Sequence, residues 1–135
     1  MMEEYKYALM PLLAWLGAGT LKFAVNFIRF RKKAFAYIGN GGFPSTHTTI
    51  ISSITALIGL KEGVNTPFFG LAVAVMMVVM IDAMGIRQAV GKHAALLNAH
   101  LCKEKPLRER QGHKPYEVLG GIAWGIVLAF LWNRL

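Results

Sequence analysis

Two short stretches of the chain each place a histidine beside the point where an apolar helix is expected to begin. The first is Gly41-Gly42-Phe43-Pro44-Ser45-Thr46-His47, and the second is Gly112-His113-Lys114-Pro115-Tyr116-Glu117. The start of a helix has unpaired backbone N–H groups and a partial positive charge, so it attracts phosphate. Histidine adds proton transfer or nucleophilic attack near neutral pH. The two stretches therefore predict a phosphate site with histidine chemistry.

The composition of the chain indicates a membrane protein. Hydrophobic residues make up 55% of the 135 residues and the mean hydropathy is +0.43, which is too apolar for an ordinary soluble domain of this size. The net charge is +8, but the basic residues form short clusters without zinc-finger spacing, so we expect no nucleic-acid partner. The lone Cys102 excludes an internal disulfide and a cysteine-based metal cluster. We expect one membrane-embedded domain over residues 1–135.

Five stretches have the length and pattern of helices and should position the two histidines. Four are predicted to be transmembrane helices, at residues 7–28, 45–60, 67–84 and 115–133. The second is short and rich in Ser and Thr, as expected of a helix packed among others with a polar end at a cavity. Residues 86–101 have apolar positions at intervals of three and four, which predicts an amphipathic helix at the interface or capping the bundle. The predicted fold class is therefore all-α, an integral membrane bundle of about four transmembrane helices plus one amphipathic helix.

Lys and Arg are concentrated on one predicted side of the membrane. The stretch 29–33 carries four of them and the stretch 86–114 carries seven, whereas the other side has only Lys6, Lys61 and Arg134. Because cytoplasmic loops are enriched in Lys and Arg, the basic side should face the cytoplasm. We therefore expect a multi-pass protein of the cell membrane with both histidine stretches on its cytoplasmic face.

Three blocks of residues resemble the superfamily of type 2 phosphatidic acid phosphatases and vanadium haloperoxidases, and more closely its small divergent bacterial and plant branch. The first block of the family, a Lys followed after six residues by Arg-Pro, corresponds to Lys22 and Arg29. The second block, Pro-Ser-Gly-His, corresponds to Pro44-Ser45-Thr46-His47. This chain departs from the pattern at Phe30, where the family has proline, and at Thr46, where it has glycine.

The third block of the family, Ser-Arg, five residues, His, three residues and Asp, can be placed in two ways. Arg87 and His93 keep the spacing from Arg to His, but a leucine stands where the acid should be. His113 and Glu117 keep the spacing from His to the acid. We favour the second placement, because a nucleophilic imidazole needs an acceptor on its other nitrogen to hold its tautomer and stabilise its cation. Arg87 then keeps its family role, and residues 88–112 are an insertion before the histidine.

The resemblance implies a metal-independent phosphatase without a cofactor, acting on a lipid phosphate or diphosphate. His113 would attack phosphorus and form a phosphohistidine, and Glu117 would hold its tautomer. His47 would protonate the departing alkoxide and then activate water. The phosphoryl oxygens would be neutralised by Lys22, Arg29, Ser45 and Arg87. Asp82 is a candidate partner for Arg87 or His47 on spacing alone.

Two questions stay open at the level of sequence. Prenyl diphosphates, phosphatidylglycerol phosphate and phosphatidic acid all present a phosphoester at the membrane surface, and transfer to another alcohol would use the same residues as hydrolysis. The alternative function is a non-catalytic membrane protein that keeps the fold and binds lipid phosphate or an assembly partner, and the departures at Phe30, Thr46 and Glu117 favour it. Small residues compatible with a homodimer contact are Gly17, Gly19, Gly121 and Gly125.

Overall fold

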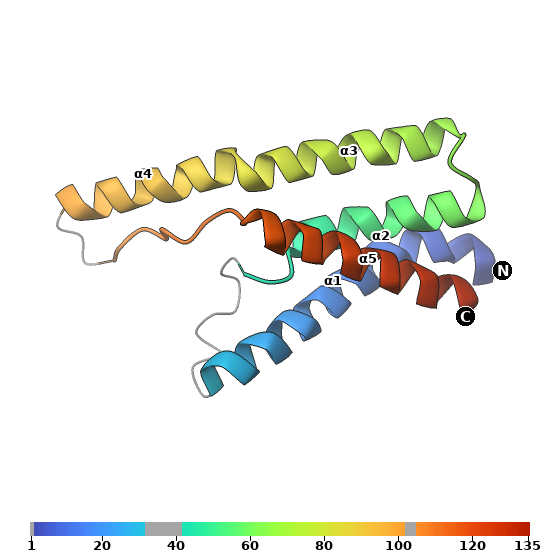
Figure 1. Cartoon of the computed structure of the whole chain (residues 1–135), viewed down its shortest axis with the longest axis horizontal. Coiled ribbons are helices and arrows are strands. Elements are labelled where there is room, and N and C mark those ends of the chain that lie inside the picture. Colours follow the sequence, from blue (N-terminus) through green and yellow to red (C-terminus); the bar gives the residue numbers. More distant parts are fainter. Residues whose placement is uncertain (1, 32–41, 102–104) are drawn as a thin grey trace.

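The computed structural model describes residues 2–31, 42–101 and 105–135, which form five helices (Figure 1). The helices are α1 (Met2–Phe30), α2 (Thr46–Lys61), α3 (Pro67–Met84), α4 (Ile86–His100) and α5 (Pro115–Arg134). The predicted all-α class is confirmed, and the helices lie where the apolar stretches predict them. Residues 32–33 of the basic stretch, the glycines at 39 and 41, and Cys102 lie outside the described residues.

Among the described residues, three segments are long and apolar enough to cross a membrane, namely Tyr5–Arg29, Pro67–His100 and Pro115–Arg134. The remaining predicted span, α2, has 16 residues, whereas a helix that crosses the hydrocarbon needs ~20. It contacts α1, α3 and α5 and therefore lies inside the bundle. Buried hydroxyls along α2 donate to carbonyls of their own helix, as Ser53 Oγ does to the Ile50 carbonyl at 2.8 Å, so this polar helix is packed without unsatisfied groups.

Helices α2 and α5 approach each other closely because α5 has glycines at the contact. A Cβ atom added at Gly125 would lie 2.6 Å from the Thr49 carbonyl oxygen, and one added at Gly121 would lie 2.7 Å from that of Ser45. Gly17 also faces the protein interior, with Leu128 3.0 Å from its added Cβ. Three of the four glycines considered for a homodimer contact are therefore used within the fold. The fourth, Gly19, has open space around it.

Helices α3 and α4 follow each other in nearly one direction, and α4 extends past the rest of the bundle (Figure 1). The Gly85 N–H donates to the Ile81 carbonyl at 2.8 Å and the Gly85 carbonyl accepts from the Ala89 N–H at 3.0 Å, so helical hydrogen bonding continues through the junction. The amphipathic helix therefore prolongs α3 and does not cap the bundle. Its polar side holds the segment 105–114, which returns toward α5, because the Asn98 side chain exchanges hydrogen bonds with the Leu107 backbone at 2.8 Å.

Helix α1 packs against the bundle at its N-terminal half and diverges from it toward its C-terminal half (Figure 1). The contact is held by Trp132 Nε1, which donates to the Lys6 carbonyl at 3.2 Å, and by a core that includes Met10, Leu57 and Ala129. Because α1 leaves the bundle, residues on its second half form one wall of a cavity.

Candidate active site

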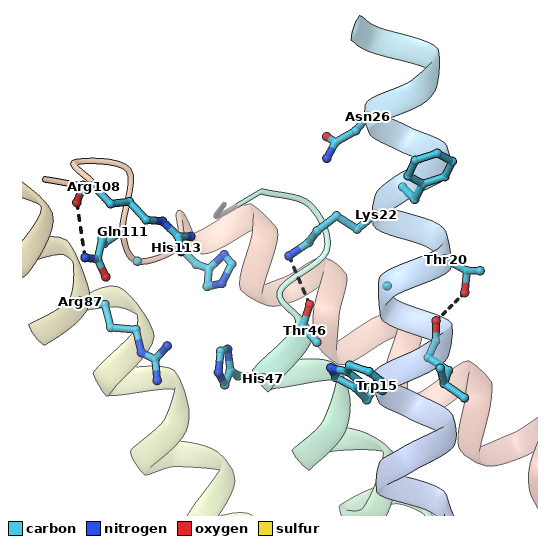
Figure 2. A pocket seen from close by; sticks show the side chains of 14 residues that line it. Trp15, Thr20, Lys22, Asn26, Thr46, His47, Arg87, Arg108, Gln111 and His113 are labelled. Atoms are coloured by element: carbon cyan, nitrogen blue, oxygen red, sulfur yellow. Dashed lines mark hydrogen bonds between the residues drawn. The ribbon is translucent and has the colours of Figure 1, made fainter. Parts of the chain in front are cut away.

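A cavity of about 700 Å³ lies between α1, the start of α2, the start of α4 and the segment that precedes α5. Figure 2 shows cations on opposite sides of it, with Lys22 on one side, Arg87 on the other, and both histidines between them. Its polar lining consists of Thr20, Lys22, Asn26, Thr46, His47, Arg87, Arg108, Gln111 and His113. Three cations from three separate elements surround two imidazoles, an arrangement suited to an anion.

The side chain of His113 is buried and held by a carboxylate. His113 is 7% exposed, and its Nδ1 lies 3.2 Å from Oε2 of Glu117, one helical turn further on. The same Oε2 accepts a hydrogen bond from the backbone N–H of Lys114 at 3.0 Å, which fixes the carboxylate at the start of α5. With Glu117 ionised, the hydrogen is placed on Nδ1 and Nε2 of His113 keeps a free lone pair. That tautomer is the one a nucleophile requires.

The backbone of His113 is held from the other side by the junction of α3 and α4. Its N–H donates to the Ala83 carbonyl at 2.9 Å, and its carbonyl accepts from Nε2 of Gln88 at 2.7 Å. The preceding Gly112 has φ +77°, a left-handed conformation that favours glycine. A Cβ there would also lie 2.8 Å from the Gln88 nitrogen. The histidine is therefore fixed at both its side chain and its main chain.

Burial lowers the pKa of His113 below its ordinary value of 6.5, because the imidazolium would be removed from water. The hydrogen bond to Glu117 acts in the opposite direction, whereas the positive charge of Lys22, and then that of Arg87, lowers this pKa further. At neutral pH His113 is therefore in its neutral form, which can attack an electrophile.

His47 presents a contrasting environment on the first turn of α2. Its side chain is exposed and lines the cavity, and within the part of the chain that the structure describes it makes no hydrogen bond. Its neighbour Thr46 accepts a hydrogen bond from Nζ of Lys22 at 3.2 Å, which ties α1 to the start of α2. His47 thus faces the cavity without a hydrogen-bond partner among the described residues, in a position suited to proton transfer. Partial burial, and then the positive charge of Arg87, lowers its pKa below 6.5.

One arginine of the cavity, Arg87, lies on α4, and the other, Arg108, lies in the segment that precedes α5. Nε of Arg87 forms an ion pair with the carboxylate of Asp82, so Arg87, not His47, is the partner that the structure gives Asp82. Arg108 lines the cavity as well, although it was not predicted to be a site residue. Leu107 occupies the position that the spacing of the family's third block assigns to arginine, and Arg108 follows it by one residue.

Five predicted or competing residues do not line the cavity; two of them, Glu117 and Asp82, instead contact the lining residues His113 and Arg87. Ser45 is completely buried, and its hydroxyl caps α2 by accepting from the Thr48 N–H at 3.4 Å. Arg29 is exposed on the last turn of α1, about 10 Å along the helix from Lys22 at 1.5 Å per residue. His93, the competing nucleophile, is exposed on α4. The structure brings together the other predicted residues and adds Thr46 and Arg108.

The residues of this cavity fall within a sequence pattern shared with other proteins. The pattern of the Divergent PAP2 family matches residues 4–128. The "Uncharacterized membrane protein YuiD" of Bacillus subtilis (strain 168) is 27% identical over 143 aligned residues, which cover 91% of this chain and 90% of that protein. No solved structure gives a significant match. The match over almost the whole chain confirms the predicted resemblance, and the protein belongs to the Divergent PAP2 family.

Proposed function

We propose that this membrane protein is a metal-independent phosphatase that removes phosphate from a lipid phosphate or diphosphate through a phosphohistidine. The observation that carries the proposal is the convergence on one cavity of a buried histidine held by a carboxylate, a second histidine without a hydrogen-bond partner among the described residues, and three cations. Divergent PAP2 membership supports a phosphatase-related reaction. Nucleophile, proton donor and anion-binding groups are the three functions that phosphoryl transfer requires.

In the first step, Nε2 of His113 attacks phosphorus and the bond from phosphorus to the ester oxygen breaks. The electron pair of that bond leaves with the alkoxide, which takes a proton from His47. Partial burial lowers the pKa of His47, and the negative charge of the bound phosphate would favour its protonated form against this effect. Glu117 stabilises the positive charge that develops on the imidazole of His113 by accepting a hydrogen bond from Nδ1–H. The products of this step are a lipid alcohol and a phosphohistidine.

The phosphoryl oxygens are neutralised by side chains of this chain. Lys22, Arg87 and Arg108 supply positive charge from three sides. The hydroxyl of Thr46, which accepts from Lys22, keeps its own hydrogen for donation to an oxygen of the phosphoryl group. We assign this role to Arg108 and Thr46 in place of Arg29 and Ser45, which do not line the cavity.

In the second step, neutral His47 removes a proton from water as the water oxygen attacks phosphorus. The phosphorus–nitrogen bond breaks, its electron pair returns to Nε2 of His113, and inorganic phosphate leaves. Another alcohol in place of water would give phosphoryl transfer by the same route. The distribution of Lys and Arg supports a cytoplasmic orientation of this site in the cell membrane.

Phosphate release by the detergent-purified protein tests the proposal. The substrates are a prenyl diphosphate, phosphatidylglycerol phosphate and phosphatidic acid, each assayed with a chelator present. We expect release from at least one lipid, and a loss of roughly 10³-fold or more in His113→Ala. His93→Ala is the matched control, because that histidine is exposed on α4 away from the cavity.

Two outcomes would contradict this function. Loss of activity in His93→Ala with retention in His113→Ala would assign the nucleophile to α4. Binding of lipid phosphate by a folded wild-type protein that releases no phosphate would support the non-catalytic alternative, a membrane protein that recognises lipid phosphate. A circular dichroism melt of each variant shows whether it is folded.

A further inference from the structure

The cavity has an apolar end as well as a polar one. Its apolar lining comes from one face of α1, where Trp15, Gly19 and Phe23 recur at intervals of four and Leu16 lies beside Trp15. Trp15 is 57% exposed and Leu16 is 58% exposed, and both belong to the candidate membrane span Tyr5–Arg29. Exposed apolar side chains within such a span face lipid. The cavity is therefore open sideways toward the hydrocarbon of the bilayer.

The two ends of the cavity lie at different depths along α1. Lys22 follows Leu16 by six residues, so the polar end is about 9 Å closer to the C-terminal end of the helix at 1.5 Å per residue. Leu16 lies near the middle of the span Tyr5–Arg29. A substrate that fills the cavity would therefore have its charge toward the membrane surface and its apolar part at the depth of the hydrocarbon. That is the orientation of a lipid phosphate in its own bilayer.

A gap in the wall of α1 separates its large apolar side chains. A Cβ added at Gly19 meets no atom within 4 Å, although this residue lies between Trp15 and Phe23 on the lining face. The absence of a side chain leaves room for an extended hydrocarbon chain against the helix backbone. We call the surface formed by Trp15, Leu16, Gly19 and Phe23 the α1 groove.

We infer that the α1 groove binds the hydrocarbon chain of the substrate, which enters the site sideways from the bilayer, so that the enzyme selects long-chain lipid phosphates over soluble phosphate esters. The inference rests on the proposed phosphatase function. The groove is continuous with the cationic end that would bind the phosphate, and this continuity favours a lipid chain over a second copy of the protein. A partner helix over Gly19 would instead close the route by which a lipid reaches the histidines.

Filling the groove tests this inference through substrate selectivity. The purified Gly19→Leu variant is compared with wild type on farnesyl phosphate and on p-nitrophenyl phosphate, a soluble ester. The ratio of kcat/KM for the two substrates should fall at least roughly tenfold, because the new side chain excludes several methylene-sized groups from the groove. Gly70→Leu is the matched control, since Gly70 is an exposed helical glycine with equally open space that does not line the cavity. Its ratio should equal that of wild type.

An unchanged ratio in Gly19→Leu would overturn the inference. A second result would also overturn it: a dimer that can be cross-linked in wild type but not in Gly19→Leu, with the same kcat/KM ratio in both proteins. The groove would then bind a partner helix. The failure of the phosphatase proposal looks different: wild type would release phosphate from neither substrate.

A binding measurement keeps the groove testable without turnover. A bromoalkyl phosphonate, which cannot be hydrolysed, should quench the fluorescence of Trp15 in both wild type and His113→Ala. The quenching should be weaker in Trp15→Phe, where Trp124 on the other side of α1 remains, and weaker in Gly19→Leu. The bromoalkyl alcohol of the same length should quench less than the phosphonate. Equal quenching of wild type and Trp15→Phe would place the chain elsewhere and overturn the inference.

Discussion

The starts of α2 and α5 each present a histidine to the same cavity, yet the two histidines are held in opposite ways. His113 is buried, its Nδ1 faces Glu117, and its main chain is bonded on both sides. His47 is exposed, and its side chain makes no hydrogen bond to the described residues. A residue that forms a covalent bond gains from one fixed tautomer, whereas a residue that first donates a proton and then accepts one needs freedom to turn. The contrast supports different roles for the two histidines.

The two helix starts are also bonded to each other. The backbone N–H of Ser45 donates to the Glu117 carbonyl at 2.9 Å, and the Ser45 hydroxyl is consumed in capping α2. Ser45 therefore couples the positions of the two histidines and does not contact the cavity. Its neighbour Thr46 lines the cavity instead. The two histidines, one with a hydrogen-bonded side chain and one without, therefore lie at the ends of helices that are bonded directly to each other.

Removal of each histidine in turn should produce the largest effects and should separate their roles. Both His113→Ala and His47→Ala should lose roughly 10³-fold in steady-state turnover. With p-nitrophenyl phosphate the leaving group needs no proton, so His47→Ala should still form the phosphohistidine and should accumulate it. His113→Ala should form none. The reaction with labelled substrate is quenched rapidly without acid, which preserves a phosphohistidine, and the base-stable phosphoryl label on the protein is measured. Label on His113→Ala would refute the assignment.

Glu117→Gln should make His113 resemble His47 by removing the charge that fixes its tautomer. Turnover should fall roughly 10²-fold or more, because the amide stabilises the wrong tautomer and not the cation. Since Glu117 raises the pKa of His113 against the effect of burial, its loss lowers that pKa further. Only neutral His113 attacks, so the acidic limb of the kcat/KM profile should move to lower pH. A limb that stays in place or moves to higher pH would belong to another group.

The helical elements and the contact between His113 and Glu117 follow from local sequence. Apolar stretches predict the helices because burial in lipid depends on composition over about twenty residues, and the i, i+4 spacing of His113 and Glu117 places both on one face of a helix start. Membership in the family was also visible in short motifs. These features share one property, namely that each depends on residues that are neighbours in the chain.

The cations and hydroxyls of the cavity could not be assigned in this way. A serine that caps a helix and a serine that binds phosphate show the same pattern, so only packing against α5 reveals that Ser45 turns inward. Arg108 belongs to an irregular segment whose path depends on distant bonds to Asn98 on α4. The segment brings Arg108 to the cavity, whereas Arg29, which has the spacing of the family block, stays on the exposed last turn of α1.

Widening the contact between α2 and α5 should test whether that contact sets the relation of the two histidines. In Gly125→Ala the new methyl would meet the Thr49 carbonyl at 2.6 Å and the Ser52 side chain at still closer range, so the helices must separate. We expect a loss of about 1–3 kcal/mol in stability and a lower rate in both chemical steps. Gly70→Ala, which adds a methyl in open space, is the control for thermal melts. Equal melting temperatures would show that the contact tolerates separation.

The smallest expected effect comes from Gln88, which we regard as a positioning residue for His113. Gln88→Leu keeps the side-chain volume but removes the hydrogen-bond donor to the His113 carbonyl. The net free energy of one such bond corresponds to roughly a 2–10-fold change in rate. The variant loosens the main chain of the fixed histidine and leaves His47 untouched. Formation of the phosphohistidine in a single turnover should therefore slow, because attack requires an aligned Nε2. Hydrolysis of the phosphohistidine once formed, in which His47 acts on water, should change less. If both steps slowed equally, or if the melting temperature alone fell, Gln88 would stabilise the fold without positioning the nucleophile. The difference in how His113 and His47 are held would then depend on Glu117.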